Sequence, residues 1–296
     1  MLIERRKFTL GTEWLYLKIY TGVKTSDIIL EEVIQPMIQG LRDYNYISKW
    51  FFIRYHDPKP HLRLRLCLRY NEDYKTVLDK IIQELERFND SGEISNISIE
   101  TYSREIERYG QERIVEAEEL FYKNSEFTLM CLSYNDEDKI VISIFYIIEI
   151  LKKLNLTTHE KYAWIQDSNN LFKKEFNADK NLNSQLDKKY RKLKPKLKIF
   201  IESDEFLNER RVINLHLEEC AVALHNILSH CEEQSLEVPL QSFFQSIFHM
   251  NLNRLFVSNQ RLFEMVIYDY LLRYYKSVMF YDNNIIVGKI RACRKV

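Results

Sequence analysis

Arginines alternate with leucines in "HLRLRLCLRY", residues 61–70, and arginine is the side chain best suited to holding a carboxylate or phosphate. Successive side chains of a strand point to opposite faces, so Arg63 and Arg65 are expected on one face and the leucines on the other. The two guanidiniums would lie about 7 Å apart, from a rise of roughly 3.3 Å per residue. Taken alone, the stretch is better explained as the solvated face of a half-buried strand whose arginine stems cover apolar surface.

A second charged stretch is "ETYSREIERYGQER", residues 100–113. If its middle is helical, Glu105 and Arg108 share a face and can form an ion pair, with Tyr102 nearby. A carboxylate held by an arginine can act as a general base, or it can simply orient that arginine. By itself, this spacing is more typical of an ordinary exposed ion pair.

A third stretch, "QSIFHMNLNRLF" at 245–256, places His249 on a largely apolar helix, with Asn253 one turn further on. Histidine is the natural proton carrier near neutral pH. A single histidine on an apolar helix is nevertheless more often a core residue. Each of the three signals is weak alone, and only their joint occurrence in this order carries weight.

The elements that must position these residues begin with strands and helices in the first third of the chain. Alternating apolar and polar residues predict strands at 13–22, 48–57, 61–70 and 93–102. Helical spacing predicts a helix over 25–44, bent at Pro36, and another over 74–88.

The remaining two-thirds of the chain has mostly helical spacing. Helices are expected at 111–122, 126–153, 158–176, 184–206, 211–232, 238–249 and 258–278. The last apolar runs, 281–290, predict a closing hairpin around Asp-Asn-Asn, and 176–198 is the candidate mobile segment. The expected fold is therefore α+β, a small N-terminal sheet packed against a predominantly helical C-terminal two-thirds, as a single domain over 1–296.

Composition excludes several classes of protein. Lys plus Arg equals Asp plus Glu, 43 against 43, so no net charge draws the chain to nucleic acid or membrane. Five cysteines form no CxxC pair, and no signal peptide or long apolar run is present. Six glycines leave little room for a phosphate-binding loop. These features predict a soluble, cytoplasmic protein.

In this order, the three stretches resemble the lantibiotic dehydratase C-terminal family, also called the thiopeptide-type bacteriocin biosynthesis domain. The resemblance runs from "EWLYLKIY" through "WFFIRYHDPKPHLRLRL", "YSREIERYG" and "AEELFYKNSEFTL" to "HMNLNRLF". The arginine-bearing second and third motifs are its most specific part, and the last motif adds their order.

The resemblance implies an activity. In full-length class I lanthipeptide dehydratases this domain follows a larger one, which uses glutamyl-tRNA to esterify Ser and Thr of a precursor peptide. The smaller domain then eliminates glutamate and leaves dehydroalanine or dehydrobutyrine. The chain is too short for the larger domain, so the expectation is a stand-alone lyase, the elimination partner of a split dehydratase in lanthipeptide or thiopeptide biosynthesis.

The resemblance also leaves alternatives. The same domain occurs as the pyridine synthase of thiopeptide pathways, which joins two dehydroalanines in a formal 4+2 cycloaddition. Those cyclases largely lack the elimination residues, whereas this chain has matches at Arg63, Arg65, Glu105, Arg108 and His249. These matches favour elimination. A third alternative is a non-catalytic module that binds the leader peptide and scaffolds a partner.

Elimination needs a base, an enolate stabiliser and an anchor for the glutamyl group. Arg63 and Arg65 suit the anchor or the stabiliser, and Arg108, oriented by Glu105, suits the same work from the opposite wall. His249 can be the base or the acid, and the sequence does not choose. No metal or organic cofactor is required, and no ligand spacing for one is found.

The expected partners are the glutamylated precursor peptide with its leader and a separate glutamyl-tRNA-dependent glutamylation protein. No membrane and no direct nucleic-acid contact are expected, and the oligomeric state is left open, with a homodimer as the one arrangement considered. The basic run over 188–198 is better explained as a solvated helix face than as a surface for tRNA, leader peptide or the glutamylation protein.

Overall fold

The computed structural model describes residues 4–232 and 237–293, and these form two compact units. The first unit combines the N-terminal segment up to Tyr134 with 215–260, and the second combines 135–214 with the segment from Arg261. The α+β class is confirmed, since the described strands all lie before Arg104 and the rest is helical. The single domain over 1–296 stays a prediction.

The main sheet of the first unit is antiparallel and has the order β3–β4–β2–β5. Its strands are β2 Trp14–Thr21, β3 Ile47–Tyr55, β4 His61–Leu68 and β5 Ile94–Ile99. A two-residue ladder joins β1, Lys7–Phe8, to β6, Tyr102–Ser103. All four predicted strands are confirmed.

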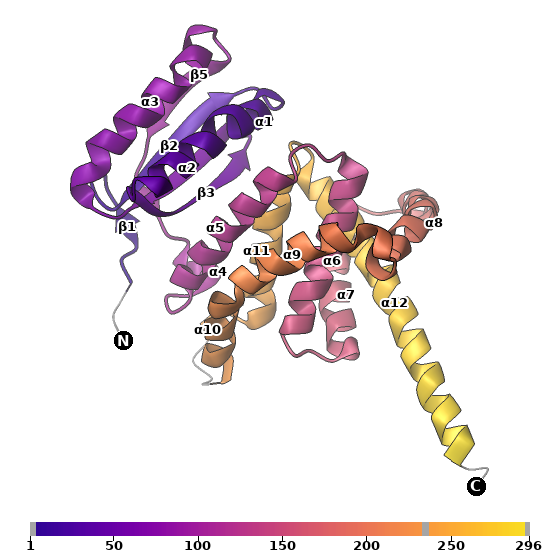
Figure 1. Ribbon diagram of the computed structural model, residues 1–296. Coiled ribbons are helices and arrows are strands. Elements are labelled where there is room, and N and C mark those ends of the chain that lie inside the picture. Colours follow the sequence, from indigo (N-terminus) through magenta and orange to yellow (C-terminus); the bar gives the residue numbers. More distant parts are fainter. Residues whose placement is uncertain (1–3, 233–236, 294–296) are drawn as a thin grey trace. The chain divides into compact units, whose positions relative to one another are not determined.

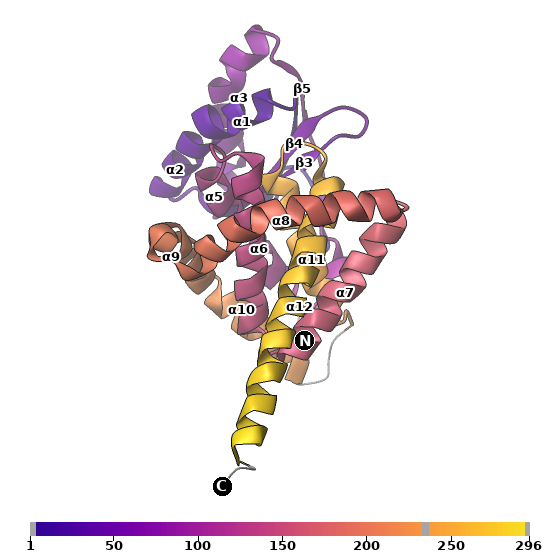
Figure 2. The same cartoon turned by 90° about the vertical axis from the view of Figure 1, so that its right-hand side faces the viewer.

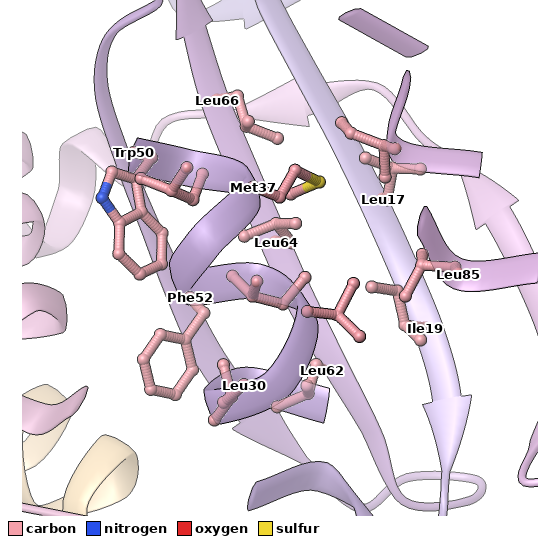
Figure 3. Close-up of a cluster of buried hydrophobic side chains, with 14 of the residues drawn as sticks. Leu17, Ile19, Leu30, Met37, Trp50, Phe52, Leu62, Leu64, Leu66 and Leu85 are labelled. Atoms are coloured by element: carbon pink, nitrogen blue, oxygen red, sulfur yellow. The ribbon is translucent and has the colours of Figure 1, made fainter. Parts of the chain in front are cut away.

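One face of this sheet carries the hydrophobic core. Leu62, Leu64, Leu66 and Leu68 are at most 4% exposed and pack with apolar residues of the covering helices, as predicted from the alternation (Figure 3). The helices on this face are α1 Thr25–Ile29, a π-helical turn Leu30–Ile34, α2 Gln35–Asp43 and α3 Tyr74–Asp90 (Figure 1).

A π-helical turn stands directly before Pro36, where the sequence predicts a bend, and the bend itself stays a prediction. Proline has no N–H to donate to the preceding turn of the helix, and a widened turn accommodates this loss. Gln35 accordingly donates its N–H to the carbonyl of Leu30, five residues earlier.

The outer edge of β3 is closed by side chains rather than by another strand. The Asn253 amide bonds both the N–H and the carbonyl of Arg54, each at 2.9 Å. Arg254 donates from Nε to the carbonyl of Phe52 at 2.7 Å, and the Ser125 hydroxyl accepts from the Phe52 N–H. These bonds satisfy an edge that would otherwise invite pairing with another chain, and they fix helices α5 and α11 against the sheet.

The helices of the first unit beyond the sheet are α4 Ile106–Tyr109, α5 Ile114–Met130, α10 Ala221–Glu232 and α11 Leu240–Leu255. The second unit is built from α6 Asp136–Lys153, α7 Thr158–Glu175, α8 Lys180–Glu202 and most of α12 Gln260–Cys293 (Figure 2). Helix α9, Leu207–Glu219, belongs partly to each unit. In the second unit the buried carboxylate of Asp269 is held by Lys173 and Arg273.

Three sequence predictions need correction. The helix expected over 126–153 is two helices, because the Asn135 side chain accepts from the Asp138 N–H and caps α6. The helix expected over 211–232 is interrupted at Cys220. The closing hairpin is wrong, since α12 continues to Cys293: extending an existing helix costs little per residue, even through Asp and Asn.

The candidate mobile segment 176–198 lies for the most part in helix α8. In the described part of the chain, no helix combines the length and the apolar character needed to cross a membrane.

The imidazole of His216 provides a test of the packing in the first unit. It is 5% exposed and stacks on Phe127, with ring centroids 4.9 Å apart. Burial, with a smaller contribution from the Lys123 charge, lowers the pKa of His216 to about 4. Between pH 6.5, the ordinary pKa of histidine, and about pH 4, His216 is therefore protonated in the unfolded chain but neutral in the folded chain.

The free energy of unfolding should consequently fall by about 1.4 kcal/mol per pH unit from this group as the pH drops from 6.5 towards 4. His216→Phe should reduce the slope of the unfolding free energy against pH by the contribution of one proton. Urea unfolding at several pH values measures this slope. His225→Phe, at an exposed histidine of α10, is the control and should leave the slope unchanged. An equal slope in His216→Phe would contradict the account.

Candidate functional site

The face of the sheet opposite the leucines carries the charged and aromatic residues. Arg65 is paired in the register with Phe51 on one side and Tyr16 on the other. The next row pairs Arg63 with Ile53 and with Lys18. The predicted placement of the two arginines on one face is therefore confirmed.

Arg65 lies in a cage of aromatic rings. Its guanidinium carbon is 4.4 Å from the ring centre of Tyr16, 5.1 Å from Tyr102 and 5.3 Å from Phe51. The residue is 8% exposed, and its Nε is buried without a hydrogen-bond partner. Within the described residues, Arg65 forms no hydrogen bond or ion pair. A buried cation supported only by ring faces can receive an anion directly.

Other buried arginines of the same unit differ from Arg65 in this respect. Arg54 donates to Ser26, Asp27 and the carbonyl of Arg254. Arg104 forms a bidentate pair with Glu118. Burying a charge without a partner costs free energy, so the exception points to a function rather than to stability.

A buried carboxylate fixes one ring of the cage, that of Tyr102. Glu118 is fully buried and accepts from the Tyr102 hydroxyl at 2.8 Å and from Arg104 at 2.7 Å. Burial and the Glu118 charge raise the pKa of Tyr102 well above its ordinary value, so the hydroxyl stays protonated and keeps donating. Tyr102 is further fixed by stacking on Phe8 and contacting Trp14.

Arg65 lines a small pocket that is partly open to solvent. The other walls come from β3, β6, α4, α5 and α11 and consist of Phe51, Ile53, Tyr102, Ser103, Glu105, Tyr109, Ile114, Phe121, Met250 and Arg254. The pocket thus combines an apolar lining with a few convergent charged groups.

The predicted ion pair lies at this pocket. Glu105 precedes the short helix α4, and its carboxylate is 3.2 Å from the Arg108 Nε. Both side chains are about half exposed, 55% for Glu105 and 45% for Arg108. Burial raises the pKa of Tyr109, and Glu105 raises it further, so at neutral pH the phenol is protonated and can donate. Glu105 is therefore a solvent-accessible carboxylate beside a buried hydroxyl.

His249 is placed differently. It is partly buried on α11, one residue before Met250, and it is not among the residues that line the pocket. The same helix supplies Met250 and Arg254 to the lining, and Arg254 also donates to the carbonyls of Phe52 and Met250. The structure therefore brings Arg65 and Glu105 to one pocket, with Arg108 paired to Glu105 but outside the lining, and His249 also lies outside the lining.

Arg63 lies beside the pocket in the neighbouring row. Its guanidinium carbon is 3.5 Å from the ring centre of Tyr55, and its Nε donates to His61 Nε2 at 3.1 Å. No carboxylate of the described chain pairs with it. Two cations without carboxylate partners thus occur on one face of β4.

Sequence reasoning missed several residues of the site. Tyr109 and Arg254 stand inside the quoted motifs, yet nothing in their spacing separates them from core and surface residues. Glu118 lies within a helical pattern, where a buried carboxylate cannot be told from an exposed one. As for metals, no cluster of three or more His, Cys, Asp or Glu side chains that could hold an ion occurs in the described ranges.

The sequence of the chain also matches known proteins. The family model for the C-terminal part of lantibiotic biosynthesis dehydratases matches residues 14–275. The subtilin biosynthesis protein SpaB of Bacillus subtilis is 27% identical over 266 residues, 84% of this chain and 24% of the relative. The nisin biosynthesis protein NisB of Lactococcus lactis subsp. lactis is 28% identical over 294 residues, 93% of this chain and 26% of the relative. The chain thus spans about a quarter of the length of these relatives.

Solved structures share the fold at low identity. The tRNA-dependent lantibiotic dehydratase MibB from Microbispora sp. 107891 has a TM-score of 0.67 at 18% identity, over 90% of this chain and 28% of MibB. TsrL has a TM-score of 0.66 at 14% identity, over 90% of this chain and 95% of its own. The pyridine synthase TbtD from thiomuracin biosynthesis has a TM-score of 0.60 at 12% identity, with 90% and 99% covered.

Because Arg104 has a carboxylate partner and Arg65 has none among the described residues, substitution of the two arginines should change the free energy of unfolding by very different amounts. Arg104→Met should lower the free energy of unfolding by about 3–5 kcal/mol, because it leaves the buried Glu118 charge without its cation. Arg65→Met should change it by no more than about 1 kcal/mol, because no carboxylate loses a partner and methionine also packs on aromatic rings. Urea unfolding of the two variants measures both. Equal losses would show that Arg65 is an ordinary structural arginine.

Proposed function

Because the chain belongs to the lantibiotic biosynthesis dehydratase C-terminal family, we propose that it acts in peptide dehydration, by eliminating glutamate from glutamylated Ser or Thr. The products are dehydroalanine and dehydrobutyrine in a ribosomally made precursor peptide. The single observation that carries the proposal is the buried guanidinium of Arg65, which is without a protein anion and lines a pocket.

The chemistry requires such a group. A base removes the Cα proton, negative charge builds on the adjacent amide oxygen, the Cβ–O bond breaks, and glutamate leaves as a carboxylate. A fixed cation in a poorly solvated site stabilises this developing charge far more than a solvated one does. Arg65 is held by three rings before the substrate arrives, so it needs little reorganisation during the reaction.

We assign the two arginines different roles within this proposal. Arg65, in the pocket, stabilises the enolate oxygen. Arg63, in the next row and more accessible, holds the free carboxylate of the glutamyl group. Their spacing on alternate positions of one strand suits a substrate that presents two oxygen-bearing groups at once.

Proton transfer is assigned to the remaining predicted residues. Glu105 contributes a carboxylate to the pocket lining and is the candidate base, oriented by Arg108. His249, on the helix that supplies Met250, is the candidate donor to the leaving carboxylate. The proposed partners are the leader-bearing precursor peptide and a separate glutamyl-tRNA-dependent glutamylation protein, with the reaction taking place in the cytoplasm.

The test is mass spectrometry of a glutamylated precursor peptide incubated with the protein. Each glutamylated site should lose one glutamate and end one water lighter than the unmodified residue. Arg65→Met should slow this loss by about 10²–10³-fold, because a charge-stabilising donor is removed. Arg108→Gln should also slow it, because the candidate base Glu105 loses the cation that orients it. Glutamylated peptide should accumulate in both, while peptide affinity stays within a few-fold of the original.

Controls separate this activity from its alternatives. Lys188→Gln, at an exposed lysine of α8 in the second unit, should eliminate at the original rate. Normal elimination in both arginine variants would make the site assignment wrong. Ring closure on a dehydroalanine-bearing peptide, with no loss from the ester, would indicate a cyclase instead. Loss of peptide binding without any reaction would indicate a binding module.

A further inference from the structure

Next to Arg63 lies a buried titratable side chain, that of His61, which the proposed chemistry does not use. His61 begins β4, is 3% exposed and lies between two tyrosine rings. Its ring centre is 4.7 Å from that of Tyr20 and 5.4 Å from that of Tyr55. The imidazole is therefore clamped in one orientation, with Arg63 two residues further along the same face.

The two hydrogen bonds of this imidazole determine its tautomer. Nδ1 lies 2.8 Å from the carbonyl oxygen of Lys59, which can only accept, so Nδ1 carries the proton. Nε2 lies 3.1 Å from Nε of Arg63, which can only donate, so Nε2 presents its lone pair. A protonated imidazole would have no acceptor to offer and would place a cation against a cation.

The charges around His61 act in the same direction. Burial lowers the pKa of His61 below its ordinary value, although the bond to the Lys59 carbonyl opposes this. The nearby charges of Arg63, Lys18 and His56 lower the pKa of His61 further. His61 is consequently neutral at neutral pH and is a permanent acceptor for Arg63.

We propose that His61 is a positioning residue, which holds the Arg63 guanidinium against the Tyr55 ring and leaves its two terminal nitrogens available to a substrate carboxylate. The proposal rests on the elimination activity proposed above, for which Arg63 is the anchor. It assigns His61 no contact with the reacting atoms. Its effect on the reaction passes entirely through Arg63.

A double-mutant cycle tests this dependence. His61→Phe keeps an aromatic ring between the two tyrosines but removes the acceptor, and it should lower kcat/KM for elimination about tenfold, as expected for loss of one charge-assisted hydrogen bond. His61→Gln, whose amide oxygen can accept from Arg63, should restore most of this loss. In an Arg63→Gln background, His61→Phe should have no further effect, because the group it positions is already gone. A tenfold loss that persists in that background would overturn the proposal, since a general structural role predicts it.

A second measurement keeps this test distinct from that of the proposed function. Nitrogen-15 NMR of the histidine side chains reports the tautomer of His61 whether or not the protein eliminates glutamate. The neutral Nδ1–H form is expected at pH 7, with the Nε2 resonance shifted in Arg63→Gln. A charged ring or the Nε2–H tautomer at pH 7 would overturn the positioning role. Failure to eliminate from any glutamylated peptide, with the NMR result as expected, would overturn only the proposed function.

Discussion

A buried cation without a protein anion is the constraint around which the first unit is organised. Arg65 occupies a central strand of the sheet and is 8% exposed, so most of its side chain, Nε included, is withdrawn from bulk water. The cost of burying it has to be offset by neighbours, and the structure does this with ring faces rather than carboxylates. A carboxylate in contact with Arg65 would stabilise the fold more, but it would also occupy the position that an anionic substrate needs.

The hydrogen bonds among Tyr102, Arg104 and Glu118 explain why Arg65 has no carboxylate partner in the described chain. Glu118 is a fully buried carboxylate of the same unit, and both of its oxygens are bound by Arg104 and the Tyr102 hydroxyl. Two oxygens bound by three donors leave that carboxylate little capacity for another cation. At the other wall, the bonds from Asn253 and Arg254 to the edge of β3 fix α11, and with it the Met250 side of the pocket.

Much of this could be predicted from the sequence, because period-two alternation fixes which face of β4 carries leucines and which carries arginines. The motif order also identified Glu105 and Arg108, whose ion pair is present. What could not be predicted depends on contacts between distant segments. Within the part of the chain that the structure describes, Arg65 lacks a carboxylate partner because Glu118 is bound by Arg104 and Tyr102. The spacing of these residues in the sequence does not show which arginine pairs with Glu118. A local signal was also missed at Asn135, whose side chain caps the start of α6 and so fixes the boundary between α5 and α6.

Arg65 has no anion from the described protein chain, and we propose that the substrate supplies one. The most direct measurement is a crystal structure with a peptide in which the glutamyl ester oxygen is replaced by an amide nitrogen, which makes the group a poor leaving group. We expect an oxygen of the glutamylated residue within hydrogen-bond distance of the Arg65 guanidinium, with the glutamyl carboxylate at Arg63. A bound analogue that leaves Arg65 without an anionic or carbonyl partner would contradict the proposal.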